Sequence, residues 1–530
     1  MREYSLPAIA PGAVQAYLDR PADSYDFLKS VPQEELAAHA RELGYRYVTE
    51  PRISQLVCNI IAYQEPRFLF YKDMGGGKTK TILDIIRFRK SRGELQRALI
   101  AMPEFVHIDV WKEQLAEHAP DLKYVELSGD KEERLELIEK KADVYLIIYP
   151  GLPVFMSELK EGKKGKNKKV VDSDSAAAFA SLFNFVTFEE VHRIRDHESL
   201  TFRLCCWLAA AAPFCYGLTG TPFRRNLMML WTQFKMVDEG ETFGSLGMYR
   251  AALFKAKRRQ FGRKFAGYDF TFDETKAPAL HRLMKHRSIV YDRKELKLEL
   301  PHRTNLRVDV RMTKEQRMYY DRIKGKMKEA KGDYESLENI YIRFRQCASG
   351  FLSLRADDES RIEVDMQPNP KIEALKQVVL DMEGEKFIVF HRFYHSGNKI
   401  RRLLDSMKVP WATLYGRSRM RADGLDPDGQ YKQFLEDKSC LGFVLQHEAG
   451  SEAINPHHVC DYLWFYERPD DPVISEQAEN RVDRPGKTDP CFIGDLVVLG
   501  TVEEKLIDYV REGRELFGAV MKGEVPCEEL

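Results

Sequence analysis

The sequence predicts an α/β protein made of two parallel-sheet lobes with a helical insertion between them. Two observations predict the lobes: apolar strand-like runs alternate with helical patterns from Tyr45 to about Asp238, and again from residue 286 to residue 512. A third predicts the insertion, because a basic and aromatic stretch breaks this alternation. The expected order is an N-terminal extension, a first lobe, the insertion, a second lobe and a tail, at residues 1–45, 46–238, 239–285, 286–512 and 513–530.

The composition is that of an ordinary globular protein. The 530 residues suffice for two to four domains, and 44% hydrophobic with 31% charged residues does not predict disorder. Lys and Arg number 82, as do Asp and Glu, so any basic surface must be local. The nine cysteines form no C-x-x-C pair, which predicts reduced thiols, a cytoplasmic setting and no zinc site. The most apolar stretch, residues 204–218, is too short to cross a bilayer, and no signal peptide opens the chain.

The segment FLFYKDMGGGKTKTILDII at residues 68–86 has the order strand, glycine-rich loop and helix. Gly75–Gly77 have no side chains to stop backbone N–H groups from curling round a polyphosphate. Lys78 would bind the β- and γ-phosphates of ATP, and the Thr79 hydroxyl would bind Mg²⁺. Lys72 stands where the longer motif usually has its first glycine. The alternative is a plain glycine-rich turn.

Two carboxylates follow another apolar run, in FVTFEEVHRIRD at residues 185–196. Beside a phosphate-binding loop, one of Glu189 and Glu190 would hold Mg²⁺ through water, and the other would orient or deprotonate the attacking water. A solvated acidic turn is the alternative. Farther on, LTGTPFRRN places the hydroxyls of Thr219 and Thr221 where they would bridge the nucleotide site and a bound strand, unless the turn is purely structural.

The order of these segments resembles that of superfamily 2 helicases and, within them, the Swi/Snf-type DNA translocases, particularly short phage-like members without accessory domains. The resemblance implies RecA-like lobes and a nucleic-acid-stimulated ATPase. Gln55 in PRISQ falls where the family has its adenine-reading glutamine. ALIAMPEFVHIDVWKEQL, with Pro103 and Trp111, looks like motif Ia, EEVH like the DEAH box and LTGTP like motif III.

The second half carries the remaining motifs. KFIVFHRF resembles motif IV, AGSEAIN with Ser451 resembles motif V, and EQAENRVDRPGK resembles motif VI. Arg481 and Arg484 are expected on one face of a helical turn, from which their guanidinium groups would stabilise charge on the γ-phosphate. Gln477 would sense the nucleotide. Taken alone, EQAENRVDR favours a charged surface helix.

The resemblance implies ATP and Mg²⁺ as cofactors. The expected catalytic residues are Glu190, Lys78, Arg481 and Arg484, and the expected metal ligands are Thr79 and Glu189. The expected ATP contacts are Gln55, Met74, Gly75, Gly76, Gly77, Lys78, Thr79, Lys80, His192 and Gln477. The expected nucleic-acid contacts are Pro103, Thr219, Thr221, Lys257, Arg258, Arg259 and Ser451.

The chain departs from the family at two motifs. Glu189 replaces the magnesium aspartate, which lengthens the reach by about 1.5 Å and predicts slow turnover, with Glu189→Asp preserving or raising activity. In motif V, Ala453 and Pro456 stand where glycine and leucine are usual.

The interpretation is an ATP-dependent translocase that moves along duplex or branched DNA without reading sequence. The basic insertion interleaves Lys257, Arg258 and Arg259 with aromatic residues, which suits a nucleic-acid face or, alternatively, an amphipathic helical bundle. The lysine run at residues 160–169 favours a flexible loop over a DNA clamp. Rival interpretations are a strand-separating DNA or RNA helicase and a nucleotide-gated binding module with weak hydrolysis. Replication, repair or recombination proteins are candidate partners of a chain expected to be a cytoplasmic monomer, in the host cell if viral.

Overall fold

The computed structural model contains two compact units, residues 1–298 and 299–530, each with its own sheet and core. It describes residues 17–19, 24–161, 167–220, 227–261, 264–292, 294–296, 301–329, 334–355, 361–416, 419–420, 423–450, 454–484, 487, 489–516 and 519. Within these ranges no helix combines the length and apolarity needed to cross a membrane.

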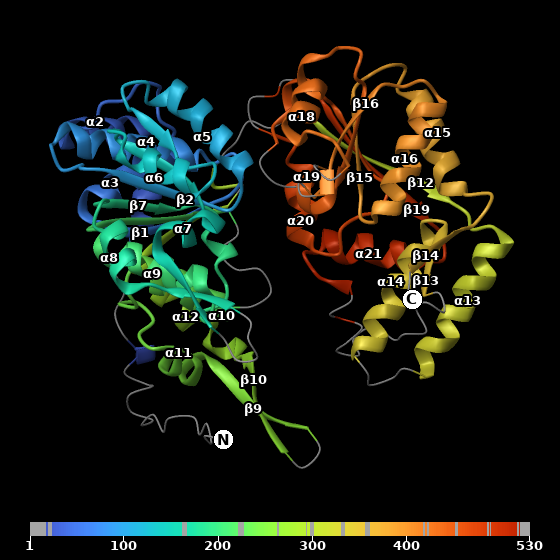
Figure 1. Ribbon diagram of the computed structural model, residues 1–530, viewed down its shortest axis with the longest axis horizontal. Coiled ribbons are helices and arrows are strands. Elements are labelled where there is room, and N and C mark those ends of the chain that lie inside the picture. Colours follow the sequence, from blue (N-terminus) through green and yellow to red (C-terminus); the bar gives the residue numbers. More distant parts are fainter. Residues whose placement is uncertain are drawn as a thin grey trace. The chain divides into compact units, whose positions relative to one another are not determined.

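A seven-stranded sheet forms the centre of the first unit (Figure 1). Its strands are β1 (Arg67–Lys72), β2 (Ala98–Met102), β3 (Tyr124–Glu126), β4 (Val144–Ile148), β7 (Phe185–Phe188), β8 (Phe214–Thr219) and β11 (Ser288–Tyr291). The order is β11-β1-β8-β7-β2-β4-β3, and all neighbours are parallel. Helices cover both faces of such a sheet, which explains why these strands are nearly continuous apolar runs in the sequence.

Two groups of helices cover the two faces. Phe68 and Phe70 of β1 belong to the core beneath α2 (Gln33–Leu43), α3 (Ile53–Gln64), α4 (Lys78–Ser91) and α5 (Phe105–His118). Leu69 and Tyr71 belong to the opposite core, to which the remaining helices contribute: α6 (Lys131–Glu139), α7 (Pro153–Met156), α8 (Ser173–Ala180), α9 (Leu200–Ala211), α10 (Met228–Val237), α11 (Leu246–Leu253) and α12 (Ala277–Lys285). The sheet is therefore the middle layer of three.

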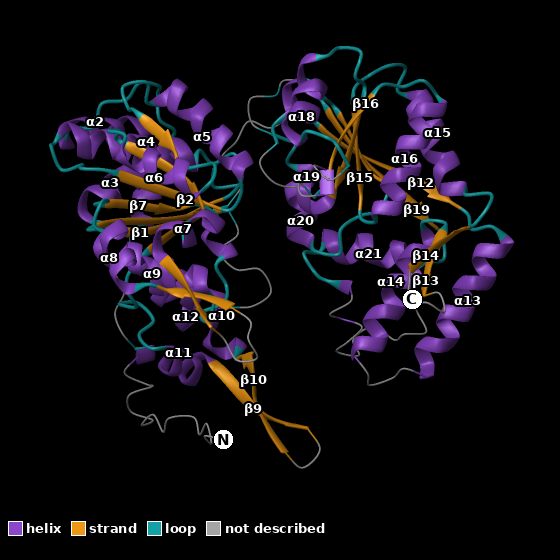
Figure 2. Ribbon diagram, viewed as in Figure 1, coloured by secondary structure: helices purple, strands orange, loops and turns teal. Residues whose placement is uncertain are grey.

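The segment predicted as a helical insertion is only partly helical. Lys255, Lys257, Arg258, Arg259 and Lys264 lie in an antiparallel hairpin of β9 (Phe254–Phe261) and β10 (Lys264–Phe272) that extends from α11 (Figure 2). Tyr249 of α11 and Leu280 of α12 are buried in the first unit's core, so the insertion is part of this unit. A second hairpin, β5 (Ser157–Glu161) and β6 (Asn167–Val171), contains the described lysines of the 160–169 run.

The predicted limits of the first lobe are too narrow at both ends. Leu36 and Ala40 of α2 are buried in its core, so described residues before position 46 belong to it. Residues 286–298, predicted to open the second lobe, also belong to it, because β11 pairs with β1 from Leu69 opposite Ser288. The division between the units falls after Leu298.

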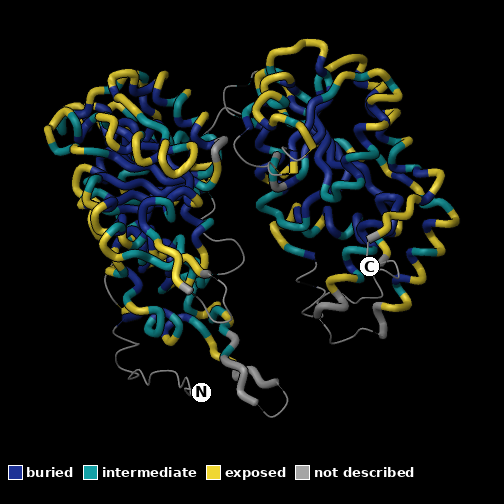
Figure 3. The backbone as a smooth tube through the Cα atoms, viewed as in Figure 1, coloured by how far each residue is buried: buried dark blue, intermediate teal, exposed yellow. Residues whose placement is uncertain are grey.

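The second unit has a six-stranded parallel sheet (Figure 3), in which all strands but the edge strand at Arg303–Val310 are largely buried. Its strands are β12 (Arg303–Val310), β15 (Phe387–His391), β16 (Trp411–Leu414), β17 (Gly442–Gln446), β18 (Tyr462–Phe465) and β19 (Cys491–Val498), in the order β12-β19-β18-β15-β17-β16. One face packs on α15 (Pro370–Asp381) and α16 (Tyr394–Ser406), the other on α18 (Pro427–Glu436), α19 (His447–Gly450) and α20 (Pro472–Glu479). The two predicted parallel-sheet lobes are confirmed.

A satellite core completes the second unit. It joins α13 (Lys314–Glu329), α14 (Tyr334–Ala348) and α21 (Val502–Arg511) to a hairpin of β13 (Phe351–Arg355) and β14 (Arg361–Asp365). Tyr320, Phe344 and Leu506 are almost fully buried in it. This cluster anchors the segments that lead into β15 and out of β19.

Candidate nucleotide site

The glycine-rich loop joins β1 to α4 at the carboxyl edge of the first sheet. Gly75 and Gly77 have φ angles of 74° and 68°, a region that favours glycine, so the loop turns as the sequence predicts. A Cβ atom on Gly77 would collide with the Gln55 amide. The Lys78 ammonium donates to the Lys72 carbonyl oxygen over 3.1 Å, which holds it beside the loop. Backbone N–H groups, a helix N-terminus and an ammonium thus meet in one place, which suits a polyphosphate.

The start of α3 braces this loop from behind. The Gln55 side chain accepts from the Arg52 backbone N–H over 2.8 Å and donates to the Gly77 carbonyl over 3.3 Å. Arg52 Nη1 donates to the Gly75 carbonyl over 2.8 Å. Arg52 was not predicted as a residue of this site. Its position three residues before Gln55, at the start of the same helix, could have indicated that it lies beside the loop. Adenine recognition by Gln55 stays a prediction.

Three other predicted ATP contacts differ in their surroundings. Thr79 is half-buried at the first turn of α4. The Lys80 ammonium pairs with Asp84 at 2.7 Å and both are buried, so only its backbone N–H is left for the predicted contact. The backbone N–H of Met74 donates to Asp73 Oδ1 over 2.7 Å.

Lys72, the residue in place of a motif glycine, is fully buried beneath the loop. Its ammonium donates to the Thr81 hydroxyl over 3.2 Å, and that hydroxyl donates to the Gly77 carbonyl over 3.0 Å. Burial lowers the pKa of Lys72 to about 8. A second cationic group therefore supports the loop from its inner side.

Glu189 lies at the end of β7 and is 8% exposed. Its backbone N–H donates to the Ala101 carbonyl over 2.8 Å, and its carbonyl accepts from the Tyr149 hydroxyl over 2.6 Å. The indole Nε1 of Trp111 donates to Oε2 of the carboxylate. Burial and the neighbouring charge of Glu190 raise the pKa of Glu189 to about 7.

Glu190 points to a different set of partners. Its φ of 45° is unusual for a residue with a side chain, and such backbone strain clusters at functional sites. The Thr219 hydroxyl donates to Oε2 over 2.8 Å, and His192 Nδ1 lies 3.1 Å from the same oxygen. Although burial opposes it, the Lys78 charge and these contacts hold the pKa of Glu190 well below its usual range. The pKa values of these two adjacent carboxylates are therefore shifted in opposite directions, an arrangement typical of catalytic pairs.

Thr219 and His192 both act through Glu190. Each is buried, and the His192 Nδ1 lies 2.7 Å from the Thr219 hydroxyl oxygen. Thr219 is fully buried and its hydroxyl supports a carboxylate of the nucleotide site; its contact with nucleic acid stays a prediction. Thr221 lies outside the described residues.

Mg²⁺ fits the oxygen donors at this edge. Within the described ranges, no group of three or more His, Cys, Asp and Glu side chains could hold a metal ion. The Thr79 hydroxyl and the Glu189 carboxylate are hard oxygen ligands, the kind that Mg²⁺ uses when substrate phosphates and water complete its shell. The predicted ligand pair is therefore chemically suitable for a metal bound with the nucleotide.

A surface pocket of about 600 Å³ lies beside the nucleotide site in the first unit. Pro103 lines it, as do Arg193 and Arg195, which follow the carboxylate pair, and Ser199 and Thr201 at the start of α9. The complete lining adds Glu104, Tyr149, Pro150, Ile194, Asp196, Met228 and Met229. The pocket mixes guanidinium and hydroxyl donors with apolar surface, and the contact of Pro103 with a nucleic-acid strand stays a prediction.

Of the other predicted nucleic-acid residues, one is exposed, and the structure does not describe the side chains of the rest. Lys257 is exposed on β9, opposite Asp269 of β10. Arg258 and Arg259 are on the same strand, with side chains outside the described set. Ser451 and Ala453 of the segment resembling motif V are also outside it.

In the second unit, the two predicted catalytic arginines lie just beyond α20, which ends at Glu479, and are not on a helix as expected. Arg481 is 5% exposed and donates to the carbonyls of Gln477 and Ile454 over 3.0 and 2.8 Å. Arg484 is half-buried and donates to Asn455. The Oε1 atom of the buried Gln477 has no hydrogen bond within the described residues. Both arginines thus fasten this turn to the end of the segment that resembles motif V.

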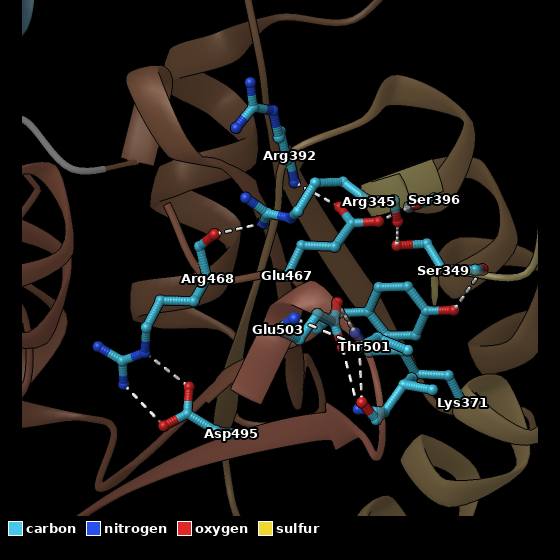
Figure 4. Close-up of polar contacts among 12 residues, drawn as sticks. Arg345, Ser349, Lys371, Arg392, Ser396, Glu467, Arg468, Asp495, Thr501 and Glu503 are labelled. Atoms are coloured by element: carbon cyan, nitrogen blue, oxygen red, sulfur yellow. Dashed lines mark hydrogen bonds and ion pairs between the residues drawn. The ribbon is translucent and has the colours of Figure 1, made fainter. Parts of the chain in front are cut away.

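A buried ionic network surrounds Arg468 and Glu467 in the second unit (Figure 4). Arg468 donates to both carboxylate oxygens of Asp495 over 2.7 and 2.9 Å, and to Ser475 and Glu479 of α20 over 2.6 Å each. Glu467 accepts from the backbone N–H groups of Arg392 and Phe393 at the start of α16. This network could not be predicted from local sequence patterns, because its members come from distant segments.

A glycine loop between a parallel strand and a helix, beside paired carboxylates at a neighbouring strand end, defines a P-loop nucleotide-binding lobe. With a second parallel-sheet lobe, this is the architecture of superfamily 2. The family model for the SNF2-related domain matches residues 57–359, and the chain belongs to this family.

Relatives agree with this assignment. The chain is 24% identical over 469 residues to the probable ATP-dependent DNA helicase CHR23 of Arabidopsis thaliana, covering 83% of this chain and 40% of the relative. It is 23% identical over 460 residues to the ISWI chromatin-remodeling complex ATPase ISW1 of Saccharomyces cerevisiae, covering 82% and 37%. The chain thus spans about two fifths of the length of these curated relatives.

One solved structure is the Sulfolobus solfataricus SWI2/SNF2 ATPase core in complex with dsDNA. It is 19% identical to this chain, the match covers 91% of this chain and 95% of that structure, and the TM-score is 0.39. The likeness to phage members stays a prediction.

Proposed function

We propose that the chain couples ATP hydrolysis to movement along duplex or branched DNA. The observation that supports this most is that Glu189 and Glu190, beside the glycine loop, have different hydrogen-bond partners and opposite pKa shifts. One carboxylate has a raised pKa, the other a lowered pKa, and Lys78 acts on both. Membership of the SNF2-related family supports the same activity.

This function assigns a role to each of the following nucleotide-site residues of the first lobe. Backbone N–H groups of Gly75–Gly77 and the Lys78 ammonium bind the phosphates, while Thr79 and Glu189 hold Mg²⁺. The metal neutralises charge on the phosphates when it is bound. Glu190, fixed by Thr219 and His192, orients the attacking water through an ionised carboxylate.

We assign Arg481 and Arg484 of the second lobe to the transition state. Their present hydrogen bonds to Gln477, Ile454 and Asn455 must be exchanged for bonds to phosphate oxygens. Hydrolysis would therefore depend on a rearrangement of the turn after α20, which offers a way to couple chemistry to motion.

The DNA surface is proposed to include the pocket at Pro103 and the hairpin at Lys257. Arg193, Arg195 and two hydroxyls in that pocket suit contacts with a phosphate backbone, which give affinity without reading sequence. Curated relatives described as DNA helicases support DNA as the partner.

The test is phosphate release measured with no nucleic acid, single strands, duplex and branched DNA. We expect stimulation by duplex or branched DNA and its loss in Glu190→Gln. Displacement of a triplex strand without duplex unwinding identifies a translocase, and unwinding identifies a strand-separating helicase. ATP binding without stimulated release under any condition would favour a nucleotide-gated module, which the raised pKa of Glu189 makes the second candidate.

A further inference from the structure

The glutamate in place of the family's aspartate has a backbone fixed by two strands. The Glu189 N–H is bonded to Ala101 at the end of β2, and its carbonyl accepts from Tyr149 just beyond β4. The Cα position therefore cannot shift easily. Only the length and torsions of the side chain decide where the carboxylate lies.

Trp111 of α5 contacts that carboxylate at one oxygen. The indole is 0% exposed within the core beneath α2 to α5, and its N–H donates to Oε2. Within the described part of the chain, Oε1 receives no hydrogen bond. An indole has a single donor, so the contact with Glu189 satisfies all of its hydrogen-bonding capacity.

An aspartate at this position would be one methylene shorter, by about 1.5 Å. Close-packed cores do not let a large buried ring follow such a retreat, so the indole N–H would be left without a partner. The extra methylene is therefore the feature that lets this carboxylate reach Trp111.

We propose that Trp111 is a positioning residue that holds Glu189 through Oε2 and leaves Oε1 for the metal–nucleotide complex. This inference rests on the proposed function for its metal step, but not for the contact itself. It reverses the expectation that Glu189→Asp preserves or raises activity: the structure predicts that this change disrupts a matched pair.

The contact is tested first without nucleotide. Trp111→Phe, Glu189→Asp and the double variant are unfolded with urea, with Trp231→Phe as the matched control, because that buried indole of the same lobe donates to the Gly244 carbonyl over 3.0 Å. We expect each single change at the pair to raise the unfolding constant about tenfold or more, and the double change to exceed the larger single effect by less than about threefold. Effects that simply multiply in the double variant would overturn the contact.

The positioning role is tested by metal dependence. Binding of a fluorescent ATP analogue is titrated with Mg²⁺ and with Mn²⁺, and again in EDTA. We expect Trp111→Phe to raise the half-saturating Mg²⁺ concentration about tenfold, Glu189→Asp to do the same, and neither to change affinity in EDTA. Trp231→Phe should leave all three measurements unchanged.

The outcomes separate two failures. Wild-type protein that binds no nucleotide with either metal contradicts the proposed function, while the urea comparison still decides whether the pair is coupled. Wild-type protein that binds normally, together with a Trp111→Phe variant of unchanged metal dependence, overturns the positioning role alone. Equal losses in EDTA and in Mg²⁺ also overturn it, because they indicate a general packing defect.

Discussion

In the second lobe, the buried Arg468 has Asp495, Glu479 and Ser475 as partners, whereas in the first lobe the ammonium of the buried Lys72 has the Thr81 hydroxyl as its single hydrogen-bond partner among the described residues. The ion pairs raise the pKa of Arg468, although burial opposes this, and burial lowers the pKa of Lys72 to about 8. One cation is fully compensated and belongs to the scaffold. The other lies under a phosphate-binding loop and lacks a full counter-charge. The difference indicates that the first lobe is organised to receive negative charge, and the second to keep its own shape.

The largest expected effect comes from the carboxylate that faces Lys78. Glu190→Gln removes the charge that orients the attacking water, so we expect hydrolysis to fall about a thousandfold while ATP binding persists. Phosphate release and nucleotide binding are measured on the same preparation, with the exposed Glu136→Gln of the same lobe as control. Near-normal turnover in Glu190→Gln would remove this residue from catalysis.

The second effect tests the compensated side of the comparison. Arg468→Met removes the buried cation that Asp495 and Glu479 share and leaves them only the more exposed Arg511 and Arg303 among the described residues, so we expect a loss of about 3 to 5 kcal/mol in the free energy of unfolding, measured with urea. Lys432→Met breaks an exposed pair with Glu436 at 3.9 Å in the same lobe and should change this free energy by less than about 1 kcal/mol. If the two variants are equally stable, the network is not a scaffold.

The third substitution, Lys72→Met, is expected to raise the free energy of unfolding, whereas Arg468→Met lowers it. The folded pKa of Lys72 lies below its ordinary value of 10.5, so between about pH 8 and 10.5 the unfolded chain binds more protons, and stability rises with pH over that window. Below pH 8 the buried ammonium carries its whole penalty. We therefore expect Lys72→Met to raise the free energy of unfolding by about 3 kcal/mol at pH 7, and by progressively less towards pH 10.5.

The groups around Lys72 sharpen that test. Cys58 of α3 and Asp84 of α4 favour its charged form, while Lys78 and Arg52 oppose it. Lys72→Met should also weaken ATP binding, because the brace on Thr81 and Gly77 is lost. A variant that is more stable and binds ATP as well as wild type would show that the buried lysine has no function in the loop.

Local sequence patterns predicted the individual helices and strands better than they predicted which strands pair with one another. The run SIVY is a recognisable strand, but nothing in its residues says that it pairs with β1 rather than with the strands that follow it. In β9, aromatic and basic residues fit a strand as well as an amphipathic helix, and only the pairing with β10 decides. The Lys80–Asp84 pair is four residues apart on a helix and was readable.

The contacts that position the carboxylates of the site could not be predicted from the sequence. Trp111 and Glu189 are far apart along the chain, and their meeting depends on how α5 packs across β2 and β7. The same holds for Arg468 and Asp495 in the second lobe. The glycine loop, Lys78 and the carboxylate pair were predicted because phosphate chemistry needs those residue types in sequence. Their partners need only be near in space.

The smallest expected effect concerns a charge with no part in either interior. Lys257 is exposed on β9, and its side chain makes no hydrogen bond or ion pair within the described set of side chains. Lys257→Ala should therefore change the free energy of unfolding by less than about 0.5 kcal/mol. If the hairpin touches a phosphate backbone, duplex affinity should fall uniformly across sequences, and the slope of log affinity against log salt should fall in magnitude by about 1. Lys432→Ala, an exposed lysine of the second lobe, is the matched control. An unchanged salt slope in Lys257→Ala would remove the hairpin from the DNA surface and leave the pocket at Pro103 as the first lobe's candidate contact.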